Sequence, residues 1–190
     1  MAKALKPDLT AATMDAVEYN VTFGPRYFRV ENVPGYIVPI QPRYHAMLFP
    51  EAEVQLPLMA SSHPFGNSIR KAYLCHSNLR RLAPGAFLLF YRSQDVRAVC
   101  VLGVVEDTIV SDEAREIARF VGKRTVYSFN EIEQMAAKPV LGVLFRQSRL
   151  LDRPWPLDLL KRSGIVNGPP QSFAAIPESA QRWLIHQLHG

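Results

Sequence analysis

The sequence predicts one α+β domain whose sheet is mixed and mostly antiparallel. The chain has 190 residues, of which 48% are hydrophobic, and this is enough to bury a core without disulfides. Two apolar runs over 86–91 and 96–105 flank a short polar linker, as the strands of an antiparallel hairpin do. Helical periodicity lies on both sides of this hairpin, which is typical of an α+β fold and not of a doubly wound one. We expect an N-terminal arm or remnant over residues 1–34 and the domain itself over 35–190.

The first part of the domain is predicted as a strand, a long loop and a helix. The strand covers 36–40 and contains Pro39, which favours an edge position. Residues 41–64 are rich in proline and are expected to form a loop with short turns. A helix is expected to open at 66–68, with one face formed by Ile69, Ala72, Tyr73 and His76.

After the hairpin, helices are predicted to alternate with single strands. Ser111 is expected to cap one helix, and Ser128 and Glu131 have the spacing of a capping box for the next. The remaining elements are expected to be a strand over 140–145, a helix between Pro156 and Gly164, a strand over 172–176 and a helix from Pro177.

Cysteine usage and hydropathy exclude several classes of protein. Cys75 and Cys100 form no C-x-x-C pair, so neither a disulfide framework nor a four-ligand zinc site is expected. The five histidines are scattered, and no nucleotide-binding glycine motif is present. No apolar run approaches the length of a membrane span, and the N-terminus lacks the apolar segment of a secretory signal. We therefore expect a cytoplasmic protein that has no cofactor, no bound metal and no membrane contact.

The positive charge is concentrated in one part of the sequence. The formal net charge is +5, and residues 61–104 alone carry six basic residues and one acid. A local surplus of this kind is typical of a surface that meets an anion, above all a nucleic acid, although an ordinary solvated face is the alternative interpretation.

Four short clusters are candidates for binding a nucleic acid or one of its bases. In the first, the cations oppose the dipole at the start of the predicted helix, a place suited to an anion. The second offers an aromatic ring for stacking, and the third and fourth offer cations and polar groups in loops. The alternatives are a plain helix cap, a hairpin with an exposed tyrosine, a hydrophobic staple at Tyr127 and a simple turn. The clusters are Asn67, Ser68, Arg70 and Lys71; Tyr91, Arg92 and Ser93; Lys123, Arg124 and Thr125; and Gln171 and Ser172.

Several stretches, taken in order, resemble the PUA-like superfamily, most closely the C-terminal module of proteins that join an acetyltransferase domain to a PUA-like barrel. More distantly, they are similar to the EVE, ASCH and YTH domains. The stretches are Val38-Pro39-Ile40-Gln41-Pro42-Arg43-Tyr44-His45, Gly66-Asn67-Ser68-Ile69-Arg70-Lys71-Ala72-Tyr73-Leu74-Cys75-His76-Ser77, Phe90-Tyr91-Arg92-Ser93, Lys123-Arg124-Thr125-Val126-Tyr127-Ser128 and Pro170-Gln171-Ser172.

The resemblance implies a small β-barrel with flanking helices and a pocket that reads RNA or a modified base. The sequence departs from the pattern at Ala86, where an aspartate usually follows the turn glycine, and this puts one turn contact in doubt. No acetyl-CoA phosphate-binding loop is present in residues 1–30, so acetyltransferase activity is not expected.

Three functions follow from these observations. The leading one is a nucleic-acid-binding module for RNA or DNA. The second is a protein-interaction or regulatory subunit that partners a separate acetyltransferase. The third is an ASCH-like nuclease or modified-nucleoside hydrolase, in which Lys71 or Lys123 would act with the hydroxyl of Ser68 or Thr125.

Overall fold

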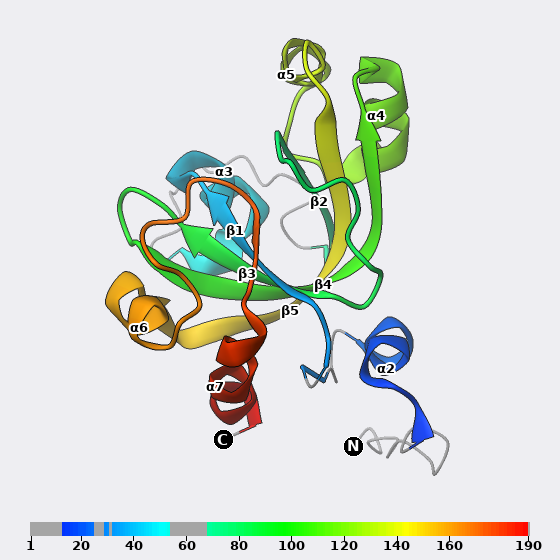
Figure 1. The fold of residues 1–190 in the computed structure, drawn as a ribbon. Helices are drawn as coiled ribbons and strands as arrows, with labels where there is room; N and C mark the ends of the chain where they lie inside the picture. Colours follow the sequence, from blue (N-terminus) through cyan, green and yellow to red (C-terminus); the bar gives the residue numbers. More distant parts are fainter. Residues whose placement is uncertain (1–12, 25–28, 31, 54–67, 190) are drawn as a thin grey trace, which may run out of the picture.

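The computed structural model describes residues 13–24, 29–30, 32–53 and 68–189, and it is built around one six-stranded sheet (Figure 1). The strand order is β2-β5-β4-β3-β1-β6, and every neighbouring pair is antiparallel except β1 and β3. The strands are β1 (Gly35–Ile40), β2 (Arg70–Cys75), β3 (Phe87–Arg92), β4 (Ala98–Ser111), β5 (Val140–Pro156) and β6 (Ala174–Ala175). The predicted α+β class and mostly antiparallel sheet are confirmed. The sheet is open within the described residues, so the closed barrel is not.

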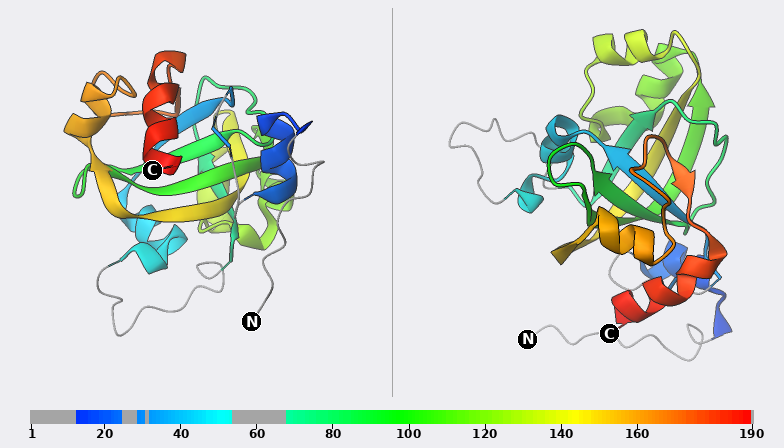
Figure 2. Two further views of the ribbon diagram at one scale, coloured as in Figure 1. Left: turned by 90° about the horizontal axis from the view of Figure 1, so that it is seen from below. Right: turned by 60° about the vertical axis from the view of Figure 1, so that its left-hand side comes forward.

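Short helices cover both ends of the strongly bent sheet (Figure 2). None of the described helices is long and apolar enough to cross a lipid bilayer. The helices are α2 (Ala16–Phe23), α3 (Pro42–Leu48), α4 (Ala114–Val121), α5 (Phe129–Met135), α6 (Leu157–Arg162) and α7 (Glu178–His189), with single 3-10 turns η1 (Pro50–Ala52) and η2 (Gly122–Arg124).

The sheet separates three apolar clusters. The inner face of the bent sheet packs against α3 around the rings of Phe49, Phe90 and Phe145. Helices α6 and α7 cover the opposite face of β1, β3 and β4, and α4 and α5 cover β2 and β5. Strand β5 contributes to all three clusters and β4 to the first two, and both strands bend where their register shifts.

Several predicted elements are confirmed with their boundary chemistry. The hairpin is β3–β4, and Ser128 and Glu131 form both hydrogen bonds of the capping box at α5. Pro156 precedes α6, and Gly164 follows it with a φ of 75°, a conformation that suits glycine. The predicted last helix is α7, and its Ala180, Leu184 and Leu188 are buried as expected.

The predicted helix over 67–76 is wrong, because this segment is strand β2. Lys71 to Leu74 are all buried, since β2 has β5 beside it, the inner core on one face and α4 and α5 on the other. A strand buried on both faces shows no alternation of polar and apolar residues, so its apolar positions can match a helical spacing by chance. Asn67 and the predicted opening at 66–67 lie outside the described residues.

The predicted loop over 41–64 is wrong in its first part, where Pro42 begins α3. Proline is well tolerated at the first helical position because that N–H needs no partner within the helix. Residues 54–64 lie outside the described residues. The predicted cap at Ser111 is displaced: this residue ends β4, Glu113 is the N-cap of α4, and the Ser111 hydroxyl accepts a hydrogen bond from the Glu113 N–H at 3.0 Å.

The predicted edge position of Pro39 is confirmed locally, at the later part of β1. Strand β6 pairs only with Tyr36 and Ile37, so the later part of β1 has a strand neighbour on one side. This leaves the carbonyl of Pro39 available to the hydroxyl of Tyr73, at 2.8 Å.

Helix α2 ties part of the predicted N-terminal arm to the sheet. The buried Asn20 amide donates to the carbonyls of Gly85 (3.0 Å) and Arg29 (2.7 Å), and Arg146 donates to the carbonyl of Val21 at 2.9 Å. Gly85 has a φ of +87°, and a Cβ there would lie 2.6 Å from the Val17 carbonyl oxygen. Glycine is therefore needed where α2 meets the Pro-Gly turn. A boundary at residue 34 stays a prediction.

Candidate functional site

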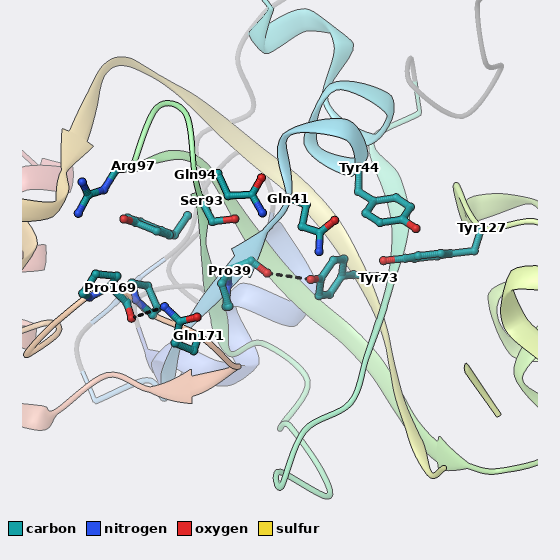
Figure 3. Close-up of a pocket in the computed structure, with 12 residues that line it drawn as sticks. Pro39, Gln41, Tyr44, Tyr73, Ser93, Gln94, Arg97, Tyr127, Pro169 and Gln171 are labelled. Carbon is teal, nitrogen blue, oxygen red and sulfur yellow. Dashed lines mark hydrogen bonds between the residues drawn. The ribbon is translucent and has the colours of Figure 1, made fainter. Parts of the chain in front are cut away.

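A pocket of about 590 Å³ opens where the ends of β1, β2 and β3 meet the loop between α6 and β6 (Figure 3). Its lining contains four tyrosines, three glutamines, one serine, one arginine and three prolines, and it contains no acid. The lining residues are Pro39, Gln41, Tyr44, Tyr73, Tyr91, Ser93, Gln94, Arg97, Tyr127, Pro169, Pro170 and Gln171.

Tyr44 and Tyr127 form the aromatic end of the pocket. Their ring centroids lie 4.8 Å apart with an interplanar angle of 38°, and both side chains are half-buried. The Tyr127 hydroxyl donates to the Leu74 carbonyl at 3.2 Å, and the Tyr44 hydroxyl donates to Glu131 at 3.4 Å. Each ring is thus held by its polar tip, which leaves apolar surface facing the pocket.

Local chemistry before α5 positions Tyr127. The Thr125 hydroxyl accepts a hydrogen bond from the Tyr127 N–H at 3.2 Å, and the capping box begins at the next residue, Ser128. Glu131 closes that box and also accepts from Tyr44. Hydrogen bonds from the Ser128 backbone and hydroxyl lower the pKa of Glu131, and Arg43 and Tyr44 lower it further. One carboxylate therefore links the cap of α5 to the pocket.

Two further tyrosines form the inner wall of the pocket. Tyr73 is 8% exposed and Tyr91 is 1% exposed, so a ligand can reach almost none of the Tyr91 ring. Tyr73 is fixed by its hydrogen bond to the Pro39 carbonyl (Figure 3). The wall is rigid and mostly apolar at this depth.

The rim of the pocket is polar. Ser93 donates to the Ile40 carbonyl at 3.1 Å, and Gln171 donates to the Pro169 carbonyl at 3.3 Å. Gln41, Gln94 and Gln171 are exposed, and each amide carries both donors and an acceptor. Arg97 supplies the one cation among the lining residues. Its backbone has a left-handed φ of 52°.

The hydroxyls of Tyr73 and Tyr127 are donors and not bases at neutral pH. Burial raises the pKa of Tyr127, with smaller contributions from Tyr44, Cys75 and Glu131, and burial also raises the pKa of Tyr73 well above its ordinary value. Both cysteines are free thiols, as the sequence predicts, and burial raises the pKa of Cys75 to about 12. A thiol in that state is a poor nucleophile.

Metal binding finds no support in the described part of the chain, where no group of three or more His, Cys, Asp or Glu side chains is placed to hold an ion. The polar side chains that line the pocket carry hydroxyl, amide and guanidinium groups.

Three of the predicted site residues line the pocket: Tyr91, Ser93 and Gln171. The first predicted cluster lies elsewhere. Ser68 is exposed and donates to the Arg70 carbonyl at 2.9 Å, and Arg70 pairs with Glu106 at 3.0 Å. These residues are not at a helix N-terminus, so the predicted dipole-assisted anion site is wrong.

Lys71 is buried, with 1% of its surface exposed. Its amine donates to the Leu48 carbonyl at 2.5 Å, lies 3.8 Å from Glu51 and lies 5.4 Å from the centre of the Phe49 ring. Burial lowers the pKa of this amine, while Glu51 raises it. An amine held in this way cannot meet an anion at the protein surface.

Arg92 is held by two acids and does not line the pocket. Its guanidinium pairs with Glu53 at 2.5 Å and with Asp95 at 2.7 Å, and these contacts brace the β3–β4 turn. Both of its neighbours in the predicted cluster, Tyr91 and Ser93, line the pocket, so this turn contributes to the site through the residues on either side of Arg92.

The third predicted cluster contributes indirectly. Lys123 is exposed and Arg124 is half-buried, and neither lines the pocket. Thr125 is buried and orients Tyr127 through the hydrogen bond given above. The lysine and hydroxyl pairs considered for catalysis are therefore not assembled in this pocket. Ser172 lines a neighbouring pocket instead.

The sequence interpretation missed most of the pocket. Pro39, Gln41 and Tyr44 lie in the stretch 38–45 that supported the family resemblance, so a signal for them was present. Tyr73 was predicted to lie on a helix, but it lies in strand β2. Gln94 and Arg97 were not among the candidate residues, because they join the site only when the hairpin turn and the 169–171 loop converge.

No family model matches the chain, and no curated protein matches it by sequence. Several solved structures match the chain in their fold. The ASCH protein from Zymomonas mobilis aligns with a TM-score of 0.59 at 15% identity, over 80% of this chain and 94% of that one. A serine-to-alanine variant and a tyrosine-to-phenylalanine variant of that protein each align with a TM-score of 0.60 at 14% identity, over 80% of this chain and 95% and 96% of theirs.

The chain has the ASCH fold. At the level of the fold, this confirms the predicted similarity to ASCH domains. The pocket lies at the open end of this ASCH fold, between the hairpin turn, α3 and the segment that precedes α5. The acetyltransferase partner that the resemblance implied stays a prediction.

Proposed function

We propose that this ASCH-fold protein binds single-stranded nucleic acid by taking one base into the tyrosine pocket. The observation that carries the proposal is the pair of Tyr44 and Tyr127 beside exposed amides in one pocket. RNA and strands with a modified base are the favoured ligands.

The size and lining of the pocket suit a flat heterocycle. A volume of about 590 Å³ falls within the range of small-molecule sites, roughly 300–1,000 Å³. Aromatic rings stack on any base, and stacking contributes about 1–3 kcal/mol for each base. The glutamine amides and the Ser93 hydroxyl can then read the polar edge of the base, as in modules that recognise splayed bases.

A paired base cannot enter such a pocket without leaving its helix. Extruding a base from a duplex costs a few kcal/mol, whereas a base in a single strand is already available. The proposal therefore requires that single strands bind more tightly than duplexes of the same sequence. The cation Arg97 at the rim provides a contact for the phosphate of the same nucleotide.

The test is fluorescence anisotropy with short labelled single-stranded and double-stranded RNA and DNA, with and without modified bases. We expect single strands to bind preferentially. Tyr127→Leu should weaken binding by about 1–3 kcal/mol through lost stacking, whereas Tyr127→Phe should keep most of the affinity.

Phe129→Ala is the matched control for a lost aromatic ring. Phe129 is 48% exposed, lies two residues from Tyr127 and does not line the pocket. Its removal should leave binding unchanged. Equal losses from Tyr127→Leu and Phe129→Ala, or equal affinity for single strands and duplexes, would contradict the proposal.

A further inference from the structure

We propose that a second pocket of about 450 Å³ binds the phosphate backbone of the strand whose base occupies the tyrosine pocket. This inference rests on the proposed function and extends it from one nucleotide to at least two. The second pocket is formed by the chain that follows β2, the connection from α5 to β5, and the residues before β6.

The lining of the second pocket favours an anion. Arg80 and Lys138 reach it from segments that are far apart in the sequence, and His76, Ser77, Asn78 and Ser172 add polar groups. No acid is among its lining residues. Within the described residues, neither Arg80 nor Lys138 takes part in an ion pair, whereas Arg70, Lys71 and Arg92 all do.

Arg80 therefore differs from Arg70, Lys71 and Arg92 of the basic segment 61–104, and Lys138 adds a second cation from outside that segment. Acids from other parts of the chain offset the charges of Arg70, Lys71 and Arg92, and these residues offer little attraction to a ligand. Arg80 and Lys138 are exposed and converge on one concave surface, where their charges add. Guanidinium and ammonium groups are the side chains that most often contact phosphate.

One continuous segment of the chain lines both pockets in turn. Gln171 lines the tyrosine pocket, and the next residues, Ser172 and Phe173, line the second one. Phe173 is 7% exposed and packs against Tyr36 with ring centroids 5.9 Å apart, so this dividing segment is anchored in the core.

Strand β2 connects the pockets on their other side. Tyr73 lines the first pocket, and His76, three residues later, lines the second. Three residues of extended chain span about 10 Å. A strand that continues beyond the bound base can bring a phosphate to Arg80 and Lys138 over such a separation, whereas a free nucleoside carries no phosphate.

The experiment compares the salt dependence of single-stranded RNA binding by the wild type and by the double variant Arg80→Gln/Lys138→Gln. Each phosphate contact to a single strand contributes about 0.7 to the slope of log affinity against log salt. Loss of two contacts should lower the slope by about 1.4. Binding of free nucleosides, measured by calorimetry, should not change.

Lys161→Gln/Arg162→Gln is the matched control, because it removes the same charge from exposed residues at the end of α6. The inference predicts that this control keeps the wild-type slope. If both double variants lower the slope equally, or if neither does, the second pocket is not a backbone site.

The outcomes separate this inference from the proposed function. RNA binding that depends on Tyr127 but keeps its slope in Arg80→Gln/Lys138→Gln would overturn the second pocket and leave the first. A wild type that binds no single strand at low salt would overturn both. The altered side chains are exposed, so both double variants should melt at the wild-type temperature.

Discussion

At the scale of single residues, neighbours in space decide the role of each charge and each ring. Lys71 and Tyr127 illustrate this. Lys71 is among the most deeply buried side chains, and its amine serves the Leu48 carbonyl and Glu51. Tyr127, which the sequence favoured as a hydrophobic staple, packs against the apolar cluster that contains Ile132, and it also lines the pocket and donates to a backbone carbonyl. The residue types alone could not show that Lys71 is a buried structural residue and that Tyr127 lines a pocket.

Replacing Lys71 with methionine tests its structural role. Lys71→Met keeps the length of the side chain but leaves the buried Leu48 carbonyl without this donor. An unsatisfied buried acceptor costs about 1–3 kcal/mol, so the free energy of unfolding should fall by that amount. Nucleic-acid affinity, measured on the folded variant, should stay at the wild-type value. A large loss of affinity with unchanged stability would show that Lys71 contacts the ligand.

At the scale of elements, the sequence predicted those elements whose signals are local. The capping box of α5, the β3–β4 hairpin and the ends of α6 each depend on a few neighbouring residues, and all are present. Strand β2 was mistaken for a helix because its burial on both faces comes from β5, α3, α4 and α5, which lie far from it in the sequence. The short α3 was missed because prolines on either side suggested a loop.

The capping box gives a prediction at this scale. Ser128→Ala removes the hydroxyl that accepts from the Glu131 N–H, and loss of such a cap costs about 1 kcal/mol. The same change removes one of the two Ser128 donors to Glu131, the carboxylate that accepts from Tyr44, so binding of single strands should also weaken. Thermal unfolding and anisotropy measure the two effects. Ser163→Ala, in the C-cap residue of α6, is a control that should leave binding unchanged. Weakened binding in that control would argue against a specific link between the cap and the pocket.

At the scale of the whole molecule, the charge pattern of the sequence is rearranged by folding. Residues 61–104 carry most of the positive surplus, yet acids from 51–53 and from Glu106 offset three of its cations. Arg97, Arg80 and Lys138 are exposed cations that line the pockets, where they can attract an anion. The tyrosine pocket itself combines five separate parts of the chain, which explains why only three of its residues could be predicted.

Photochemical cross-linking can show directly whether a base occupies the tyrosine pocket. The protein would be mixed with a pool of single-stranded RNA that carries 4-thiouridine, and the complex would be irradiated. The cross-linked peptides would then be mapped by mass spectrometry. We predict adducts in the peptides that contain Tyr44 and Tyr127, lost when free nucleosides compete. Adducts confined to α6, α7 or the exposed face of α4 would contradict the claim.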